Sequence, residues 1–240
     1  MNVIQTIKDH RCVRDFLDKE ISNEHLHEIL ESAHLMPTSY NSQQVSVVVV
    51  KDTATKEKIA ELSGNLPYIK KAPIFLVFVT DLYKTHLACE KNNTDQIDDN
   101  NLDIIVSATF DAGLSMAGAI LAAESLGLGV VPVGAIRTNL EELKNILELP
   151  KHVIPLVGLS IGYSASATIK KPRLDIESFA HFDNYKKDNL MGYINKYDEL
   201  METYLAKINR KQEKNWSTSI SMVYSNTMYF EQITNFINKV

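Results

Sequence analysis

Apolar and polar positions along the chain form blocks that predict short buried strands separated by helices. Four β-branched or aliphatic runs bounded by turn residues are typical of strands; they cover 45–50, 74–79, 128–133 and 153–163. Apolar stripes at helical spacing, with caps at Ser22 and Asn139, predict helices between and after them; these cover 2–9, 22–36, 53–63, 102–126, 139–149, 188–208 and 226–239. Strands separated by helices indicate a mixed α/β or an α+β core.

The most apolar part of the chain, residues 104–128, is predicted to be a core helix and not a membrane anchor. Asp111 and Glu124 interrupt it, and the uncharged stretch between them is 12 residues long. A spanning helix needs about 20 apolar residues. The many Ala, Gly and Ser residues favour a helix buried close to its neighbours. The polar segment 90–100 lacks periodicity and is expected to be a loop or lid.

Composition places the chain among globular proteins of one or two domains. It has 240 residues, 45% of them hydrophobic and 23% charged, and a formal net charge of −5. That charge argues against a nucleic-acid-coating surface. The two cysteines, Cys12 and Cys89, lie in no zinc-binding spacing and are consistent with a reduced, cytoplasmic environment. The N-terminus has no apolar stretch or small-residue cleavage site, so no signal peptide is expected.

Two short basic clusters flank a polar loop and suggest a phosphorylated ligand. The clusters are HRCVR at 10–14 and KKPR at 170–173, and the loop is PTSYNSQQ at 37–44. Arginine is permanently charged and forked, so it suits phosphate, and proline fixes the backbone of the second cluster. The sequence contains no GxGxxG or P-loop motif and no evident nucleophilic triad. If the chain is an enzyme, a cofactor is therefore expected to carry the chemistry.

Six motifs in order resemble one known family. They are His10-Arg11-x-x-Arg14 with Phe16, the loop 38–43, Gly64-Asn65-x-Pro67-Tyr68, Gly134-x-Ile136-Arg137, Lys171-Pro172-Arg173-Leu174 and Trp216-Ser217. Together they span nearly the whole chain. The set is similar to the FMN-dependent, oxygen-insensitive nitroreductases, in particular the larger subgroup of NADPH-dependent nitroreductases and flavin reductases.

The resemblance implies an α+β fold with a mixed β-sheet surrounded by helices and a C-terminal extension. It also implies a domain-entwined homodimer with one FMN in each of two interface pockets. On this basis residues 1–175 are expected to form the FMN-binding core. Residues 176–240 are expected to form a helical arm that contributes to dimerisation and nucleotide binding.

The resemblance also assigns site residues. The flavin itself carries the chemistry, so no catalytic side chain and no metal ligand is expected. The predicted FMN contacts are His10, Arg11, Cys12, Arg14, Thr38, Gln43, Tyr68, Pro132, Val133, Gly134, Ala135, Lys171 and Arg173. Arg210, Lys211 and Lys214, in a basic turn, are expected to bind the 2′-phosphate of NADPH. Trp216 is expected to serve in packing.

Three positions depart from the pattern of close relatives. Leu66 stands where they usually carry Gln, Cys12 where they carry Ser, and Pro132 removes a backbone N–H from a segment that normally offers several.

The function implied is NADPH-driven, or also NADH-driven, two-electron reduction of nitroaromatics, quinones or free flavins by a ping-pong mechanism. The small-molecule acceptor is loosely specified, and neither nucleic acid nor membrane is an expected partner. Two alternatives stay open: a non-enzymatic flavin-binding or storage protein, and another flavin enzyme on the same fold, such as a dehalogenase or dehydrogenase.

Overall fold

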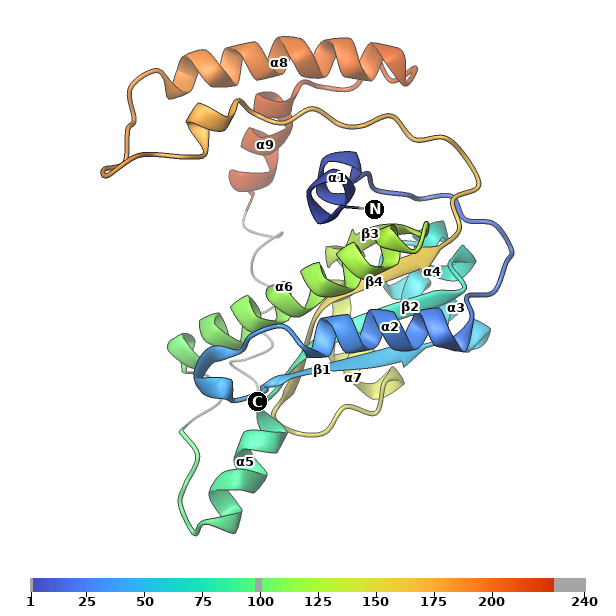
Figure 1. Ribbon diagram of the computed structural model, residues 1–240, viewed down its shortest axis with the longest axis vertical. Coiled ribbons are helices and arrows are strands. Elements are labelled where there is room, and N and C mark those ends of the chain that lie inside the picture. The colour runs from blue at the N-terminus through green and yellow to red at the C-terminus, as the bar shows by residue number, and fades with distance from the viewer. Residues whose placement is uncertain (1, 98–100, 227–240) are drawn as a thin grey trace. The chain divides into compact units, whose positions relative to one another are not determined.

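The computed structural model describes residues 2–97 and 101–226 (Figure 1). They divide into two compact units, of which the first ends at Thr168 and the second begins at Ile169. The helix predicted over 226–239 lies almost wholly outside the described residues.

All four predicted strands are present, and the predicted helices up to residue 208 are found with shifts of a few residues at their ends. The strands are β1 Val45–Val50, β2 Ile74–Asp81, β3 Gly129–Val133 and β4 Val153–Gly162. The helices of the first unit are α1 Val3–Asp9, α2 Asn23–His34, α3 Thr53–Leu62, α4 Pro67–Lys71, α5 Leu82–Lys91, α6 Leu102–Ser125 and α7 Leu140–Ile146, with 3₁₀ turns at Ser39–Asn41 and Gly134–Asn139. Both predicted N-caps form: Ser22 accepts a hydrogen bond from the His25 N–H, and Asn139 accepts one from the Glu142 N–H.

The described strands form one sheet in the order β1-β2-β4-β3, and all three neighbouring pairs are antiparallel. The expectation of a mixed sheet is corrected for these strands. Two helices, α3 and α4, separate β1 from β2, and the chain re-enters the sheet at the end where β1 finishes, with Phe75 paired to Val50. In the part of the chain that the structure describes, parallel pairing occurs at an isolated bridge between Cys12 and Val130.

Strand β2 lies inside the sheet and is covered on both faces. Its even-numbered residues, from Ile74 to Phe78, pack in a cluster with α2 and α6. Its odd-numbered residues, from Phe75 to Val79, pack in a second cluster with α3 and α7. Side chains alternate between the faces of a strand. Burial on both faces therefore explains why β2 reads as a continuous apolar run.

Helix α6 packs along α2 on the face of the sheet seen in Figure 1. At Gly118 the helices approach so closely that an added Cβ would lie 2.6 Å from the Ser32 carbonyl oxygen. Among the described residues α6 alone is long and apolar enough to cross a membrane by length and composition. Its inner face is that of a core helix, as predicted. Its outer face leaves Leu102, Val106 and Phe110 exposed by 71%, 59% and 67%.

Three helices were not predicted. Helix α5 ends at Lys91, so the segment expected to be a loop from residue 90 begins two residues later; residues 98–100 lie outside the described part. The missed signal is Asp81, which caps α5 by accepting from the Lys84 N–H. Helix α4 is one short turn, and α9, Trp216–Tyr224, is rich in Ser, Thr and Val, which lower helix propensity.

The second unit is built on α8, Leu190–Lys207, with the short α9. Tyr197, Met201 and Leu205 lie four residues apart and form one buried stripe of α8. The ring of Trp216 meets that of Tyr197 edge-on at 5.6 Å. The predicted packing role of Trp216 is confirmed within this unit. Asp198 accepts a hydrogen bond from the Ser217 N–H at 2.9 Å, which joins α8 to the start of α9.

Candidate functional site

The basic segment 10–14 runs in extended conformation from the end of α1 along β3. The Val13 N–H donates to the Val130 carbonyl at 2.9 Å, and Val13 itself is buried. Arg11 and Arg14 are exposed. One buried side chain and one backbone hydrogen bond therefore hold a segment that presents two guanidinium groups to solvent.

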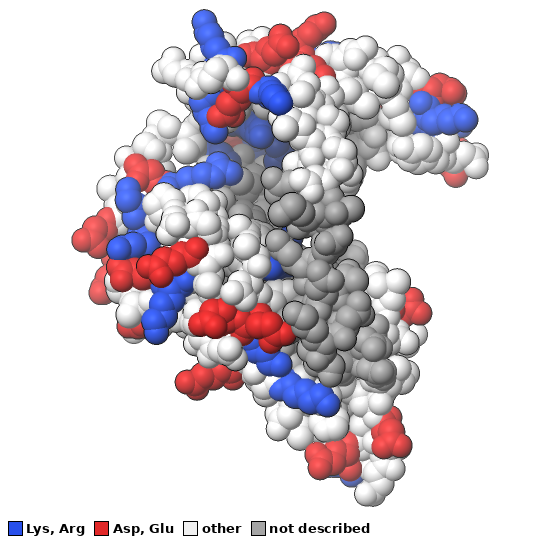
Figure 2. All heavy atoms as spheres, turned by 180° about the vertical axis from the view of Figure 1, so that it is seen from behind, with Lys and Arg blue, Asp and Glu red and all other residues white. Residues whose placement is uncertain are grey.

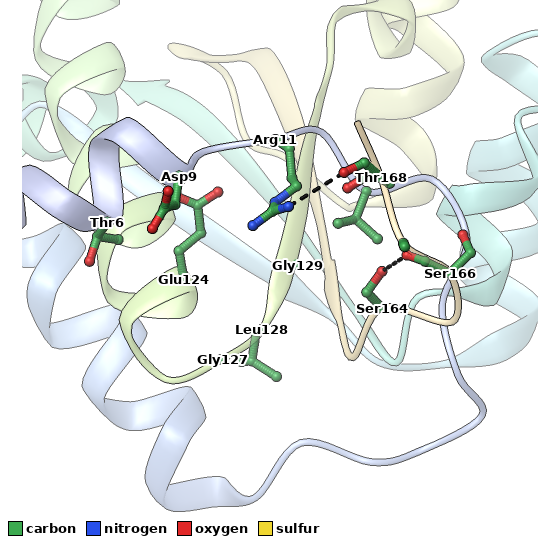
Figure 3. A pocket seen from close by; sticks show the side chains of 12 residues that line it. Thr6, Asp9, Arg11, Glu124, Gly127, Leu128, Gly129, Ser164, Ser166 and Thr168 are labelled. Atoms are coloured by element: carbon green, nitrogen blue, oxygen red, sulfur yellow. Dashed lines mark hydrogen bonds between the residues drawn. The ribbon is translucent and has the colours of Figure 1, made fainter. Parts of the chain in front are cut away.

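A pocket of about 350 Å³ lies beside this segment (Figure 3). Arg11 extends between its two walls, and its Nη1 donates to the Thr168 carbonyl at 3.4 Å. One wall carries the carboxylates of Asp9 and Glu124. The other residues that line the pocket are Thr6, Val13, Gly127, Leu128, Gly129, Ser164, Ser166, Ala167 and Thr168. The pocket thus sets one guanidinium and several hydroxyl groups, which can bind a polar, anionic group, opposite two carboxylates.

His10 is fixed by a carboxylate that sequence analysis recognised only as an interruption of an apolar stretch. Its Nδ1 lies 2.6 Å from Oε1 of Glu124, which is on α6. Hydrogen bonds with the side chains of Cys12 and Glu124 raise the pKa of His10 to about 9, against the opposing effect of burial. His10 is therefore positively charged at neutral pH and adds a third cation to the segment.

We expect the Glu124→Gln substitution to lower the pKa of His10, because the neutral amide removes a hydrogen-bonded negative charge. The folded-state pKa of about 9 exceeds the value of 6.5 that a histidine has in the unfolded chain. The pair's contribution to stability is therefore complete below pH 6.5 and is lost as the pH rises through 9. NMR titration of the imidazole and unfolding at pH 6.5 and 9.5 measure both effects. The exposed Glu28→Gln is the matched control; an unchanged His10 pKa in Glu124→Gln would contradict this account.

Tyr68 and the segment 132–135 lie beside the basic segment. Tyr68 packs against a cluster that contains Val13 and Val131, and Cys12 packs against the same cluster. Tyr68 also packs against the cluster that holds Val133 and Ala135. Pro67 starts α4, after a turn in which Gly64 and Asn65 both have positive φ.

The 132–135 segment is shaped by Arg137. Pro132 stands in β3, which is an edge of the described sheet, where a missing N–H is tolerated. Arg137 donates to the Leu156 carbonyl at 2.8 Å, and burial lowers the pKa of its guanidinium. A Cβ at Gly134 would come within 3.2 Å of Arg137 Nη2. The glycine therefore lets the chain pass closely over this arginine.

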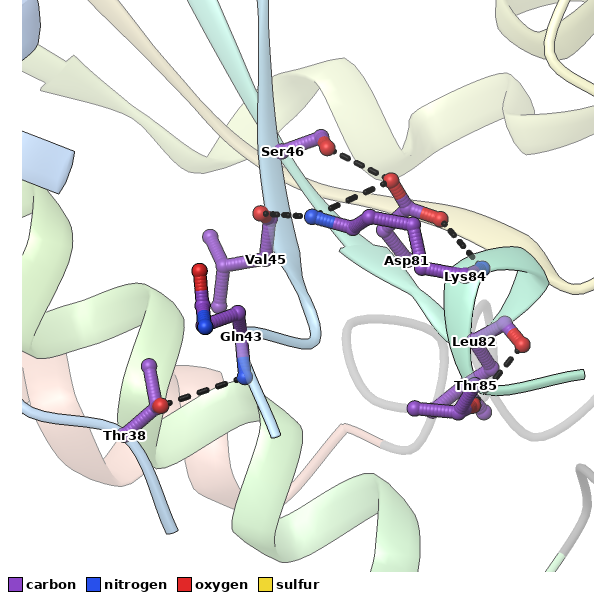
Figure 4. Close-up of polar contacts among 8 residues, drawn as sticks. All are labelled: Thr38, Gln43, Val45, Ser46, Asp81, Leu82, Lys84 and Thr85. Carbon is purple, nitrogen blue, oxygen red and sulfur yellow. Dashed lines mark hydrogen bonds and ion pairs between the residues drawn. The ribbon is translucent and has the colours of Figure 1, made fainter. Parts of the chain in front are cut away.

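The polar loop 38–44 is compact and irregular. Thr38 Oγ1 accepts a hydrogen bond from the Gln43 N–H at 3.2 Å (Figure 4). Tyr40, Asn41 and Gln43 have φ of 53°, 54° and 50°. The Ser42 hydroxyl is buried without a hydrogen-bond partner in the described part of the chain.

Within one chain the structure does not bring this loop to the basic segment. The loop is bonded to Asp111 and the basic segment to Glu124, both on α6. These residues are 13 positions apart. At 1.5 Å per residue their backbones are about 20 Å apart along the helix. The predicted contacts therefore form two groups: 10–14 with Tyr68 and 132–135, and 38–43.

The remaining predicted residues belong to the second unit. Lys171 and Arg173 are exposed on either side of Pro172, whose carbonyl accepts from the Tyr197 hydroxyl at 2.9 Å. In the basic turn, Arg210 pairs with Glu213, and Lys214 Nζ lies 2.9 Å from the Met222 sulfur. Lys211 is exposed.

Comparison with known proteins matches both parts of the chain. The profile described as "Nitroreductase family" matches residues 7–163, and that of the "Nitroreductase family, C-terminal domain" matches 171–240. The chain belongs to the nitroreductase family. The family and the α+β fold predicted from the six motifs are confirmed.

Relatives within the nitroreductase family match this chain over nearly its whole length. The FMN reductase [NAD(P)H] of Bacillus subtilis is 41% identical over 240 residues, with 99% of this chain and 96% of that protein covered. The solved structure of B. megaterium NfrA2 is 38% identical, with a TM-score of 0.95 and 100% and 97% coverage. The NADPH:FMN oxidoreductase of Vibrio harveyi, complexed with NAD⁺, is 26% identical, with a TM-score of 0.89 and the same coverage.

On the face seen in Figure 2, acidic and basic side chains are interspersed, and neither sign forms a broad patch.

Proposed function

We propose that this nitroreductase-family chain is a cytoplasmic FMN-dependent oxidoreductase that uses NADPH, or NADH, to reduce nitroaromatics, quinones or free flavins. The observation that carries the proposal is its 41% identity, along almost its full length, to an FMN reductase that uses NAD(P)H. FMN supplies hydride acceptance and donation when it is bound. The protein supplies the binding, the orientation and the electrostatics.

The side chains of the first unit suit FMN. Arg11 and Arg14 offer exposed guanidinium groups to a phosphate, and Ser164 and Ser166 bring hydroxyl groups to the pocket beside Arg11. Tyr68 contributes a half-buried aromatic ring.

We infer a homodimer in which each FMN site combines residues of both chains. The two groups of predicted contacts lie about 20 Å apart along α6. The exposed apolar stripe Leu102-Val106-Phe110 lies on that same helix and favours packing against a second copy. A twofold axis near α6 would place the loop of one chain beside the basic segment of its partner.

The absorbance spectrum of the purified protein tests the function directly. A yellow protein that releases FMN on denaturation, and whose flavin is bleached by NADPH and reoxidised by a quinone, is expected. Colourless protein that takes up no added FMN would contradict the proposal. Bound flavin that NADPH leaves unbleached would favour the storage protein instead.

Mixed dimers test whether the site is composite. In a heterodimer of Arg14→Ala and Gln43→Ala chains, a composite arrangement places both substitutions in one site and leaves the other site intact. One high-affinity FMN per heterodimer is therefore expected, against none in either homodimer. If each site belonged to one chain, both sites of the heterodimer would be weakened, and no high-affinity site would return.

We expect Lys211→Ala to reduce the preference for NADPH over NADH by about tenfold, because one charge-assisted contact is worth about 1.5 kcal/mol. Arg210 already pairs with Glu213 and Lys214 with the Met222 sulfur of α9, so the exposed Lys211 is the cation that we propose to contact the phosphate. The loss should appear in KM, since the phosphate is remote from the hydride. Steady-state kcat/KM with both nucleotides measures it, with Lys207→Ala as the control. An unchanged ratio would exclude Lys211 from nucleotide choice.

A further inference from the structure

One buried carboxylate bonds both ends of the polar loop. Asp111 on α6 is only 1% exposed. Its two oxygens each accept from the Ser39 N–H at 3.1 Å, and Oδ2 also accepts from Gln44 Nε2 at 3.0 Å. Both ends of the segment 39–44 are therefore hydrogen-bonded to the same side chain, that of Asp111.

The end at Gln44 is fixed from two sides. Its side chain is buried and also donates to the Ser107 hydroxyl at 3.2 Å. Its backbone carbonyl accepts from the Asp81 N–H at 2.9 Å. Asp81 in turn accepts from the Ser46 hydroxyl at 2.5 Å and caps α5 (Figure 4). Gln44 thus connects α6 to the end of β2.

The loop between these ties has a conformation that it would not keep unaided. Tyr40, Asn41 and Gln43 occupy the left-handed region, which is disfavoured for residues that carry a Cβ. Tyr40 projects fully into solvent, so burial of its ring does not hold the loop. The bonds from Ser39 and Gln44 to Asp111 act together with the Thr38–Gln43 bond and with two backbone bonds, from the Asn41 N–H to the Thr38 carbonyl and from the Ser42 N–H to the Ser39 carbonyl.

Stability of the helix alone does not explain a carboxylate at this position. The groups that donate to Asp111 are a backbone N–H and a side-chain amide, neither of which carries a positive charge. A buried charge without a countercharge is unfavourable for folding. An apolar residue would pack well among the alanines of α6. The Asp111 carboxylate therefore stabilises the conformation of the loop, whereas its burial is unfavourable for the stability of the core.

We propose that Asp111 is the positioning residue of the FMN site, which sets the backbone of residues 39–43 and thereby orients Thr38 and Gln43 toward the bound flavin. This inference rests on the proposed function. Asp111 acts through the loop and touches neither flavin nor substrate.

Comparison of Asp111→Asn with Ser115→Ala tests the inference. Ser115 is also buried on α6 and donates to the Ala33 carbonyl at 2.8 Å, so its loss weakens α6 without reaching the loop. Fluorescence titration of the apoprotein should show an FMN Kd raised about tenfold in Asp111→Asn, equivalent to one hydrogen bond of about 1.4 kcal/mol. In Ser115→Ala the Kd should change less than about twofold, although urea unfolding shows similar destabilisation.

Amide hydrogen exchange distinguishes a local effect on the loop from a general loss of stability, because a general loss would speed exchange throughout the unit. Exchange at residues 39–44 should become faster in Asp111→Asn while that of β2 follows the global stability. If Asp111→Asn does not fold, Gln44→Ala releases one end of the loop only and should raise the Kd in the same direction. Wild-type FMN affinity in a folded Asp111→Asn protein, or in Gln44→Ala, would overturn this inference and would leave the proposed function unaffected. A wild-type protein without FMN affinity would overturn the proposed function and this inference with it.

Discussion

Replacing Phe110 by aspartate is expected to convert the protein to a monomer and to abolish FMN retention. Phe110 lies at the end of an exposed apolar stripe with Leu102 and Val106, at intervals of one helical turn. If this stripe packs against a second copy, an unpaired carboxylate buried there costs several kcal/mol. The dimer dissociation constant should rise by at least about a hundredfold. Because the proposed FMN site combines groups from two chains, flavin should be lost together with the dimer.

Sedimentation and the flavin spectrum measure these two effects on the same sample. Leu17→Asp is the matched control, because Leu17 is a large exposed apolar residue outside α6. It should leave both the dimer and the yellow colour unchanged. Circular dichroism confirms that the Phe110→Asp monomer is folded. A dimeric Phe110→Asp protein with full FMN content would exclude the α6 stripe as the interface.

Arg14→Ala and Arg173→Ala are each expected to raise the Kd for FMN tenfold to a hundredfold. A charge-assisted contact to the ligand contributes roughly 1.5–3 kcal/mol, which corresponds to that range. Both side chains are exposed, so the melting temperature of the apoprotein should change little. FMN titration and thermal unfolding of the apoproteins separate the two quantities.

Salt dependence provides a second check on the arginines. Weaker binding of the wild type at high ionic strength is expected if they contact the phosphate, and the two variants should show a smaller dependence. Lys58→Ala, a charge removed from α3, should behave like the wild type. Full occupancy and wild-type affinity in both arginine variants would identify these side chains as surface residues.

The fold was largely predictable because its core strands carry an unmistakable pattern. The run 74–79 is continuously apolar, and the structure buries it on both faces of β2. Strand direction was not predictable in the same way. Apolar periodicity indicates which residues are buried and does not indicate in which direction the next strand runs. The short α4 and the Ser- and Thr-rich α9 carry too little periodicity to be distinguished from loops.

The motifs of the candidate site are visible in the sequence, whereas the carboxylates that hold them in place are not. Arg11, Arg14 and Tyr68 stand in recognisable local patterns. Glu124 and Asp111 were visible only as charges that interrupt an apolar segment. Their partners are His10 and Ser39, which are 114 and 72 positions away. Such pairings depend on the packing of α6 against the rest of the unit, and no local pattern encodes them.

The fixed spacing between Asp111 and Glu124 along α6 restricts how the length of this helix can vary among members of the family. One residue inserted between Asp111 and Glu124 would rotate everything beyond it by about 100° and shift it by about 1.5 Å. The carboxylate that meets His10 would then face another direction while the one that meets Ser39 stayed in place. Insertions and deletions should therefore be excluded from this stretch of related sequences, even where its individual residues vary freely.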